Sequence, residues 1–390
     1  MNLLTLDVPK SSEEMIKKYR EYYDAFYLEM VRMSNVFFSE YITNFINTIT
    51  KLAKSGRKED VIRSAIGVVA LYEFGFNDFD QLSSILDRLL PQTEIEYVKF
   101  TSWCAGQITH HPTVEQSCYA SLLFKRLIGW TRSKGRRNRN LAAAHLLDSI
   151  SLQCGMVVVV FFPALQTIIW SLLSDSSLDV LKATASDNFT FSIIRYTRSD
   201  LDAYLDFFSK IISSLLNFGE PIRKITALLL LKNLINNAPD YYLAKFTDLY
   251  DLLIDSTYDE SLDVKSMCHR VMATLSQVDP KQFINIVSEK FFNWAPELLS
   301  NFPRETVDSL CILIRNVPTF MKTKVDELKN YSESLIKKLE PDSLLTLLRQ
   351  IFLTFGSVGM QIATSAMIMS LIKAPITNEF KEFMITFCSM

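Results

Sequence analysis

The chain has 390 residues, of which 48% are hydrophobic and 22% charged, and its formal net charge at pH 7 is −2. That length allows a large buried core, and a charge so near zero excludes a general electrostatic attraction to nucleic acid or to an anionic membrane. Ten glycines and twelve prolines are too few for sheets joined by tight turns or for Gly-rich phosphate loops. We therefore expect a helical protein with no nucleic-acid partner.

Six cysteines are spread widely through apolar, helix-like surroundings. They are Cys104, Cys118, Cys154, Cys268, Cys311 and Cys388. The chain does not open with a basic segment followed by an apolar cleavable one. Scattered cysteines without a secretion signal are typical of reduced core residues in an intracellular protein. We expect a cytoplasmic protein that reaches endomembranes only through its partners.

Two helices are predicted before residue 57. Residues 1–10 form a lead-in, after which Ser11 offers an N-cap and acidic residues follow in the first turn. Apolar and aromatic residues recur at helical spacing from Met15 to Phe38 and again from Ser39 to Ala53. Residues 1–56 are therefore predicted to form an N-terminal helical pair.

One pattern recurs from Gly56 onward: an acidic or polar lead, an aliphatic-basic pair, and a small residue two or three positions later. The basic residues of the six clear copies are Arg63, Lys99, Arg139, Lys182, Arg223 and Lys265. Two degenerate copies follow at Asp308 and Arg349, and successive copies lie 36 to 43 residues apart. Two helices in a period near forty residues are typical of HEAT and armadillo arrays.

We therefore predict an all-α fold of the HEAT/armadillo-like α-solenoid class, a superhelix of antiparallel helix pairs. About eight repeats occupy residues 57–377, and residues 378–390 are predicted to form a final helix without its partner, as in a truncated repeat. Residues 187–200 interrupt the rhythm and are interpreted as an inter-helix loop or a short irregular insertion. Prolines recur near the predicted helix boundaries, where the missing N–H costs least.

Each repeat is expected to join the next through its aliphatic-basic pair. The aliphatic residue packs into the neighbouring repeat, and the basic residue reaches acidic side chains or loop carbonyls across the boundary. The inter-repeat ladder predicted in this way consists of Arg63, Lys99, Lys182, Arg223 and Lys265.

The stretch from Gly135 to Lys182 is the clearest helical hairpin. Its first run is amphipathic and rich in small residues, and we expect a break at Cys154-Gly155 before a very apolar second run. The segment Gly155–Leu173 is nearly long and apolar enough to cross a membrane. A proline and three polar side chains lie inside it, which favours a repeat helix covered on both sides. We expect no membrane insertion, and a membrane-attached protein is the minor alternative.

One dense basic cluster precedes and opens that hairpin. It consists of Arg132, Lys134, Arg136, Arg137 and Arg139. The cluster can bind an acidic loop of a partner protein, a phosphate or nucleic acid. The alternative is a solvated turn between two helices, since no second cluster extends the patch.

Catalytic and metal sites are not indicated. His110-His111 lies between Cys104 and Cys118, but the intervals do not match the short paired spacings of structural zinc sites. The glycine-rich nucleotide motifs and the catalytic loops of kinases are absent from the sequence. We therefore expect no cofactor, no metal and no enzymatic activity of this chain alone.

Three runs of the sequence resemble the N-terminal HEAT solenoid of the target-of-rapamycin (TOR) kinases. They are FNDFDQLSSILDRLLPQTEIEYVKFTSWCAGQI, GRRNRNLAAAHLLDSIS and FFPALQTIIWSLLSDSSLDVLKATA. In that family a helix ending in Leu-Leu-Pro, a helix opening with Gly-Arg-Arg and a Phe-Phe…Trp helix follow in this order. The resemblance covers about Lys51 to Ala185 and continues as a pattern to about residue 330.

The resemblance implies a scaffold that organises a serine/threonine kinase complex in nutrient or growth signalling, with Raptor-like or Rictor-like protein partners. Kinase activity would belong to a TOR polypeptide, because no kinase domain is present in this sequence. The alternative is an unrelated HEAT-repeat adaptor, such as a transport receptor or a scaffold for a phosphatase or for assembly.

Overall fold

The computed structural model describes most of the chain, with gaps. The described residues are 11–18, 38–55, 57–73, 78, 81, 84–85, 88–89, 94–108, 123–125, 127–131, 137–196, 201–217, 220–244, 246–256, 258–338, 340–356, 359 and 381. These residues form helices and turns, with no strand among them. The chain divides into two compact units, Met1–Leu201 and Asp202–Met390, and each is described by itself.

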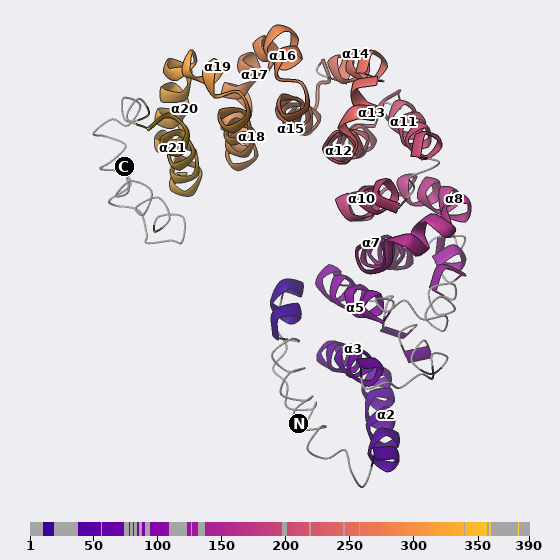
Figure 1. Ribbon diagram of the computed structural model, residues 1–390. Coiled ribbons are helices and arrows are strands. Elements are labelled where there is room, and N and C mark those ends of the chain that lie inside the picture. The colour runs from indigo at the N-terminus through magenta and orange to yellow at the C-terminus, as the bar shows by residue number, and fades with distance from the viewer. Residues whose placement is uncertain are drawn as a thin grey trace. The chain divides into compact units, whose positions relative to one another are not determined.

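The N-terminal unit is a stack of helices joined by turns (Figure 1). Its longer described helices are α2 (Phe38–Lys54), α3 (Lys58–Glu73), α5 (Ile95–Gln107), α7 (Arg137–Val160), α8 (Phe162–Leu173), α9 (Leu178–Thr184) and α10 (Asp187–Tyr196). Helices α3, α5 and α7 pack in sequence against one another, and α9 and α10 pack on α7. Each helix of the stack therefore packs mainly against helices close to it along the chain, as in repeat proteins.

The C-terminal unit repeats one helical pair several times. Its helices are α11 (Leu201–Asn217, beginning at the boundary), α12 (Pro221–Asn237), α13 (Pro239–Ala244), α14 (Phe246–Ser256), α15 (Leu262–Val278), α16 (Pro280–Gln282), the π-helical turn η2 (Phe283–Val287), α17 (Ser288–Asn301), α18 (Pro303–Asn316), α19 (Pro318–Lys322), α20 (Val325–Lys337) and α21 (Pro341–Phe355). Helices α12, α15, α18 and α21 lie side by side in what we call the first layer (Figure 1). Helices α14, α17 and α20 pack behind them as a second layer.

Proline and leucine positions explain these elements. Pro221, Pro303 and Pro341 lie in the first turns of α12, α18 and α21, where their missing N–H groups have no helical partner to lose. Inside α12, Leu231 and Ile235 are completely buried, and each such side chain contributes about 1.5–3 kcal/mol to stability. The predicted proline boundaries are confirmed at these three residues.

The N-terminal unit depends on one close approach between helices. A Cβ atom on Gly106 of α5 would lie 3.0 Å from the Cβ of Ser149 on α7. Contacts that short are not tolerated without movement of one helix, so glycine lets α5 and α7 pack closely.

The expected break at Cys154-Gly155 is wrong. Helix α7 continues through both residues to Val160, and the chain turns at Phe161. A single helical glycine costs only about 1 kcal/mol, which packing overrides. The turn falls instead before Pro163, which lies in the first turn of α8.

The loop expected over residues 187–200 is also wrong where the structure describes it, because residues 187–196 form α10. Phe189 and Ile193, one helical turn apart, are both buried, and α10 packs on α7. The burial of these side chains therefore outweighs the low helix propensity of the Asn, Thr and Ser residues in this segment. Residues 197–200 lie outside the described residues.

At the N-terminus, the side chain of Ser11 accepts a hydrogen bond from the Glu14 amide at 3.2 Å, which confirms the predicted cap. The helix expected from Met15 to Phe38 is described only through residue 18 and at Phe38, and that expected from Ser39 to Ala53 is α2. Of residues 378–390, only Lys381 is described. The predicted limits at residues 56 and 378 stay predictions.

Candidate binding surface

Three of the predicted ladder residues pair with an acid three positions earlier. The Arg63–Asp60 pair spans 3.1 Å, Lys99–Glu96 spans 3.0 Å, and Arg223–Glu220 spans 3.0 Å. Pairs of this kind contribute only about 0.2–0.5 kcal/mol each. Lys182 is exposed and Lys265 is half-buried. The ladder role of these five residues stays a prediction.

Polar links between neighbouring repeats come from other side chains. Lys224 of α12 donates to Asp259 at 2.5 Å, and Asn140 of α7 donates to Asp175 at 2.6 Å. Lys58 of α3 forms an ion pair with Glu94. In each case the acceptor is a carboxylate just before the next repeat helix, so a turn carboxylate makes the bridge.

Asp175 and Asp259 accept the same arrangement of hydrogen bonds. The second carboxylate oxygen of Asp175 accepts the Ser177 amide at 2.8 Å, and that of Asp259 accepts the Ser261 amide at 2.8 Å. Burial raises the pKa of Asp259, but the hydrogen bonds from Lys224 and Ser261 outweigh it and lower that pKa. The lowered pKa keeps Asp259 ionised, and its carboxylate both holds the turn before α15 and bridges to α12.

The N-terminal unit has a comparable carboxylate in Glu96. Burial raises its pKa, but the hydrogen bonds from Ser12 and the ion pair with Lys99 outweigh that and lower it to about 2. The Ser12 amide donates to Glu96 at 2.7 Å. This bond ties residues 11–18 to the start of α5.

Two residues of the basic cluster are described, both at the start of α7. Arg137 is its first residue and Arg139 is half-buried in its first turn; Arg132, Lys134 and Arg136 lie outside the described residues. Helices α3, α9, α15 and α18 carry acids in the first turn, whereas α7 carries none. Cations at a helix N-terminus oppose the helix dipole, typically by about 0.3–1 kcal/mol each. An anionic partner at this turn would remove that penalty.

The outward face of the first layer carries charges from successive repeats. Arg304 and Asp308 of α18 are exposed, and Arg270 of α15 and Lys232 of α12 are half-buried. Burial raises the pKa of Asp308, and the charges of Arg304, Arg270 and Lys232 act against that rise. Cations from three consecutive first-layer helices therefore lie within electrostatic reach of one carboxylate.

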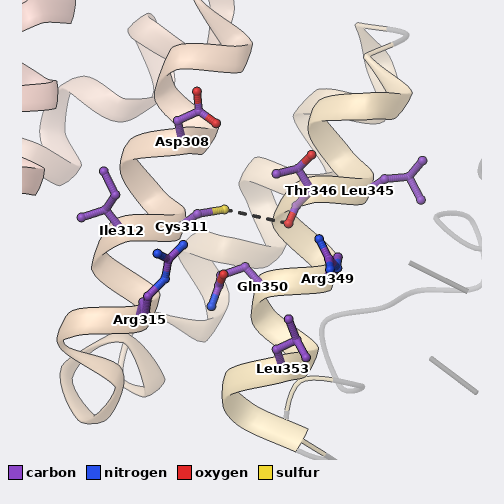
Figure 2. A pocket seen from close by; sticks show the side chains of 9 residues that line it. All are labelled: Asp308, Cys311, Ile312, Arg315, Leu345, Thr346, Arg349, Gln350 and Leu353. Carbon is purple, nitrogen blue, oxygen red and sulfur yellow. Dashed lines mark hydrogen bonds between the residues drawn. The ribbon is translucent and has the colours of Figure 1, made fainter. Parts of the chain in front are cut away.

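A pocket of about 360 Å³ opens on the same face between α18 and α21 (Figure 2). Its walls carry Asp308, Ile312 and Arg315 from α18 and Thr346, Arg349 and Leu353 from α21. At its floor Cys311 donates from Sγ to the carbonyl of Thr346 at 3.9 Å. This weak bond links the two helices across the pocket.

The buried histidine and cysteine side chains elsewhere in the described residues lie in packed surroundings. His269 stacks on Phe291 with ring centroids 3.5 Å apart, and burial lowers its pKa to about 3. Burial likewise lowers the pKa of His145 to about 4. Burial raises the pKa values of Cys104 and Cys268, which disfavours the reactive thiolate.

The described ranges of residues bear on the metal and membrane interpretations. Within them no three His, Cys, Asp or Glu side chains gather closely enough to hold a metal ion. His110, His111 and Cys118 lie outside those ranges. Among the helices that the structure describes, none combines the length and apolar character needed to cross a bilayer.

Comparison with known proteins identifies the fold. No protein-family model matches the chain, and no curated protein matches it significantly. The crystal structure of Kap121p bound to Ste12p is similar over 82% of this chain and 34% of its own, with a TM-score of 0.62 and 14% identity. A Kap95p structure, in which Kap95p binding induces the switch loops of RanGDP to adopt the GTP-bound conformation, is similar over 89% of this chain and 45% of its own, with a TM-score of 0.51 and 10% identity.

The chain thus spans less than half the length of the karyopherins that it matches. These comparisons give the TOR interpretation no specific support. At such low identity the similarity establishes architecture and not activity. The forty-residue period and the helical layers agree with that architecture: the chain is an all-α, HEAT-repeat α-solenoid.

Proposed function

We propose that this chain is a non-catalytic protein-interaction scaffold, an adaptor of the transport-receptor kind. The observation that carries the proposal is the outward face of the first layer in the C-terminal unit. There Arg304 and Asp308 are exposed and Arg270 is half-buried, and Asp308 also lines the open pocket. Stacked repeats offer extended surfaces of this type to protein partners.

The transport-receptor interpretation is preferred to the TOR interpretation on present support. The karyopherins Kap121p and Kap95p share the architecture, and each appears with a protein ligand, Ste12p and RanGDP respectively. The TOR interpretation is supported by the three sequence runs alone, and no observation on the described residues favours Raptor-like or Rictor-like partners. We further propose a cytoplasmic location, in keeping with the scattered cysteines.

Affinity purification of the full chain from its source cell, followed by cross-linking mass spectrometry, tests the scaffold proposal. We expect cross-links from partner proteins to Lys232 and Lys265 of the first layer in preference to Lys290 and Lys338 of the second. A co-purifying serine/threonine kinase polypeptide would instead support the TOR interpretation. Purified Ran, loaded with GDP or with a GTP analogue, tests the transport-receptor subtype by direct titration.

The basic cluster provides a second test of scaffold function. Replacing Arg136 and Arg137 by Glu should weaken partner capture while the helical circular dichroism stays unchanged, because charges at a rim control association more than folding. Arg57→Glu, an exposed arginine in the same unit, is the matched control. Loss of helicity in the double variant would show that the cluster is structural.

A further inference from the structure

Helices α7 and α10 of the N-terminal unit lie side by side and run in the same direction (Figure 1). Asn140, near the start of α7, meets Asp175, just before α9. Further along α7, the carbonyl of Ser151 accepts the hydroxyl of Ser192 on α10 at 2.5 Å. Both contacts advance together along the chain, so α9 and α10 run parallel to α7. The two serines are buried and mark the line along which α7 and α10 face each other.

Leu152 and Phe191 lie on the same side of this pair. Leu152 follows Ser151 and Phe191 precedes Ser192, and a step of one residue turns a side chain by about 100°. In parallel helices that face each other, a forward step on one and a backward step on the other turn both side chains toward the same side. Leu152 is 57% exposed and Phe191 is 46% exposed. Two large apolar side chains are therefore open to a partner there.

Arg195 adds a cation one turn after Phe191. Its guanidinium carbon lies 5.7 Å from the centroid of the Phe191 ring and 5.7 Å from that of the Tyr196 ring, both within cation–π range. Aromatic rings contact the face of a guanidinium, which leaves its in-plane N–H groups able to donate to a carboxylate. We call Leu152, Phe191, Arg195 and Tyr196 the α7–α10 patch.

The described residues supply no acid to this cation. None of their ion pairs involves Arg195, whose contacts are the two rings. Residues 149–160 of α7 include no Asp or Glu. Asp148 lies one turn before Ser151, whereas Arg195 lies one turn after Ser192, so their levels along the helices differ by about 9 Å. Charge complementarity therefore favours an anionic group of a partner against Arg195.

A second copy of this chain and a nucleic acid both fit the patch poorly. A two-fold interface uses the same surface of both subunits, so it would bring two copies of Arg195 together with no acid in the patch to relieve their repulsion. A nucleic-acid backbone is bound by several cations, and it would leave Leu152 and Phe191 without apolar partners. A protein segment can supply both an acidic and an apolar side chain.

We propose that the α7–α10 patch binds a segment of a partner protein in which an acidic side chain neighbours a bulky apolar one. The carboxylate accepts hydrogen bonds from Arg195, and the apolar side chain covers Leu152 and Phe191. The rings hold the guanidinium in place before binding, which lowers the entropic cost of the contact. This inference rests on the proposed scaffold function and adds to it a second surface, built from residues of the N-terminal unit alone.

Fluorescence anisotropy with the full chain and a fluorescein-labelled peptide, GSEEFLSG, tests the proposal. The matched peptides GSQQFLSG and GSKKFLSG remove or reverse its charge. We expect the acidic peptide to bind about tenfold more tightly than the glutamine peptide, because it gains a charge-assisted contact. In Arg195→Glu the order should reverse, so that the lysine peptide binds most tightly. Arg57→Glu, an exposed arginine in the same unit, is the matched control and should leave the three affinities unchanged.

Leu152→Ser tests the apolar half of the patch. It should weaken binding of the acidic peptide by about fivefold, because less apolar surface is buried on binding. Leu353→Ser, which changes a leucine of the other unit with a similar exposure of 60%, should have no effect. Circular dichroism checks that each variant folds. Equal weakening by the two serine variants would overturn the proposal.

An unchanged preference for the acidic peptide in Arg195→Glu would also overturn it, as would tighter binding of the lysine peptide or of a thymidine oligonucleotide by the natural chain. Sedimentation that shows a dimer of the natural chain but a monomer of Arg195→Glu would assign the patch to a second copy instead. Failure of the acidic peptide to bind, while partner proteins still cross-link to the first layer of the C-terminal unit, would overturn this proposal alone. Absence of partners from both surfaces would overturn the scaffold function as well.

Discussion

Asp175 in the N-terminal unit and Asp259 in the C-terminal unit occupy the same place in two copies of one motif, Asp-x-Ser-Leu-Asp-Val. Each carboxylate accepts the amide of the serine two positions later and a side chain from an earlier repeat. The donor differs: it is the amide of Asn140 in one copy and the ammonium of Lys224 in the other. The turn is therefore the constant part of the junction, and its donor varies.

The donors of these two bridges lie one position beyond the aliphatic-basic pairs that the sequence pattern selects. Asn140 and Lys224 each follow directly after a residue that the pattern selected, Arg139 and Arg223. One residue along a helix turns the side chain by about 100°, which moves it from one surface to another. The feature that both junctions share, and that marks them in the sequence, is the turn carboxylate of the Asp-x-Ser-Leu-Asp-Val motif.

Removal of the two carboxylates should have the largest effects on the free energy of unfolding, and the effects should differ between the two junctions. Asp259→Ala removes the acceptor of the Ser261 amide in the turn before α15 and leaves the ammonium of Lys224, which is 21% exposed, without its anion. We expect a loss of about 3 kcal/mol in the free energy of unfolding. Asp175→Ala removes the acceptor of two neutral donors, the Ser177 amide and the side chain of Asn140, and should cost about 2 kcal/mol.

Urea denaturation followed by circular dichroism measures both variants, and hydrogen exchange assigns each loss to its unit. Asp259→Asn is the matched control, since it keeps an oxygen for the Ser261 amide and loses only the charge. Equal costs at the two junctions, or a cost below about 1 kcal/mol for Asp259→Ala, would contradict a role for the ammonium.

The sequence predicts more of the array than of its surface. Period, prolines and leucine spacing report on packing, which every repeat shares, so the helices were predictable. The pocket was missed because it is built where the pattern degenerates: Asp308 and Arg349 take the places of clear aliphatic-basic pairs and both line it. These departures from the repeat pattern were therefore the sequence signal that could have indicated the pocket. Residues of α18 and α21 line one pocket only through packing, which the sequence does not display.

Acid should affect both units through their buried histidines, His145 on α7 and His269 on α15. Burial lowers the folded-state pKa of His269 to about 3, whereas the unfolded value is about 6.5. The unfolded state then binds the proton first, so stability is complete above about pH 6.5 and falls as the pH drops toward 3. At pH 5 the loss from His269 should be about 2 kcal/mol.

His269→Leu isolates that contribution in the C-terminal unit. Urea denaturation at pH 7 and pH 5 should show a variant whose stability changes less with pH than that of the natural chain, by about 2 kcal/mol. His145 is unchanged in this variant and serves as the internal reference for the N-terminal unit. An identical pH dependence in both proteins would mean that His269 is solvated or protonated in the folded state.

Added salt should produce the smallest difference in stability between the two junctions. The Lys224–Asp259 pair is only partly shielded, with 21% and 9% of the two side chains exposed, and the Debye length falls to about 3 Å in 1 M salt. The destabilisation caused by Lys224→Met should therefore shrink by about 0.5 kcal/mol between 0.1 M and 1 M sodium chloride. The destabilisation caused by Asn140→Leu should stay constant, because a neutral amide contributes no ion pair to screen. Parallel urea titrations at the two salt concentrations measure both differences, and an equal salt response would mean that the ammonium acts only as a hydrogen-bond donor.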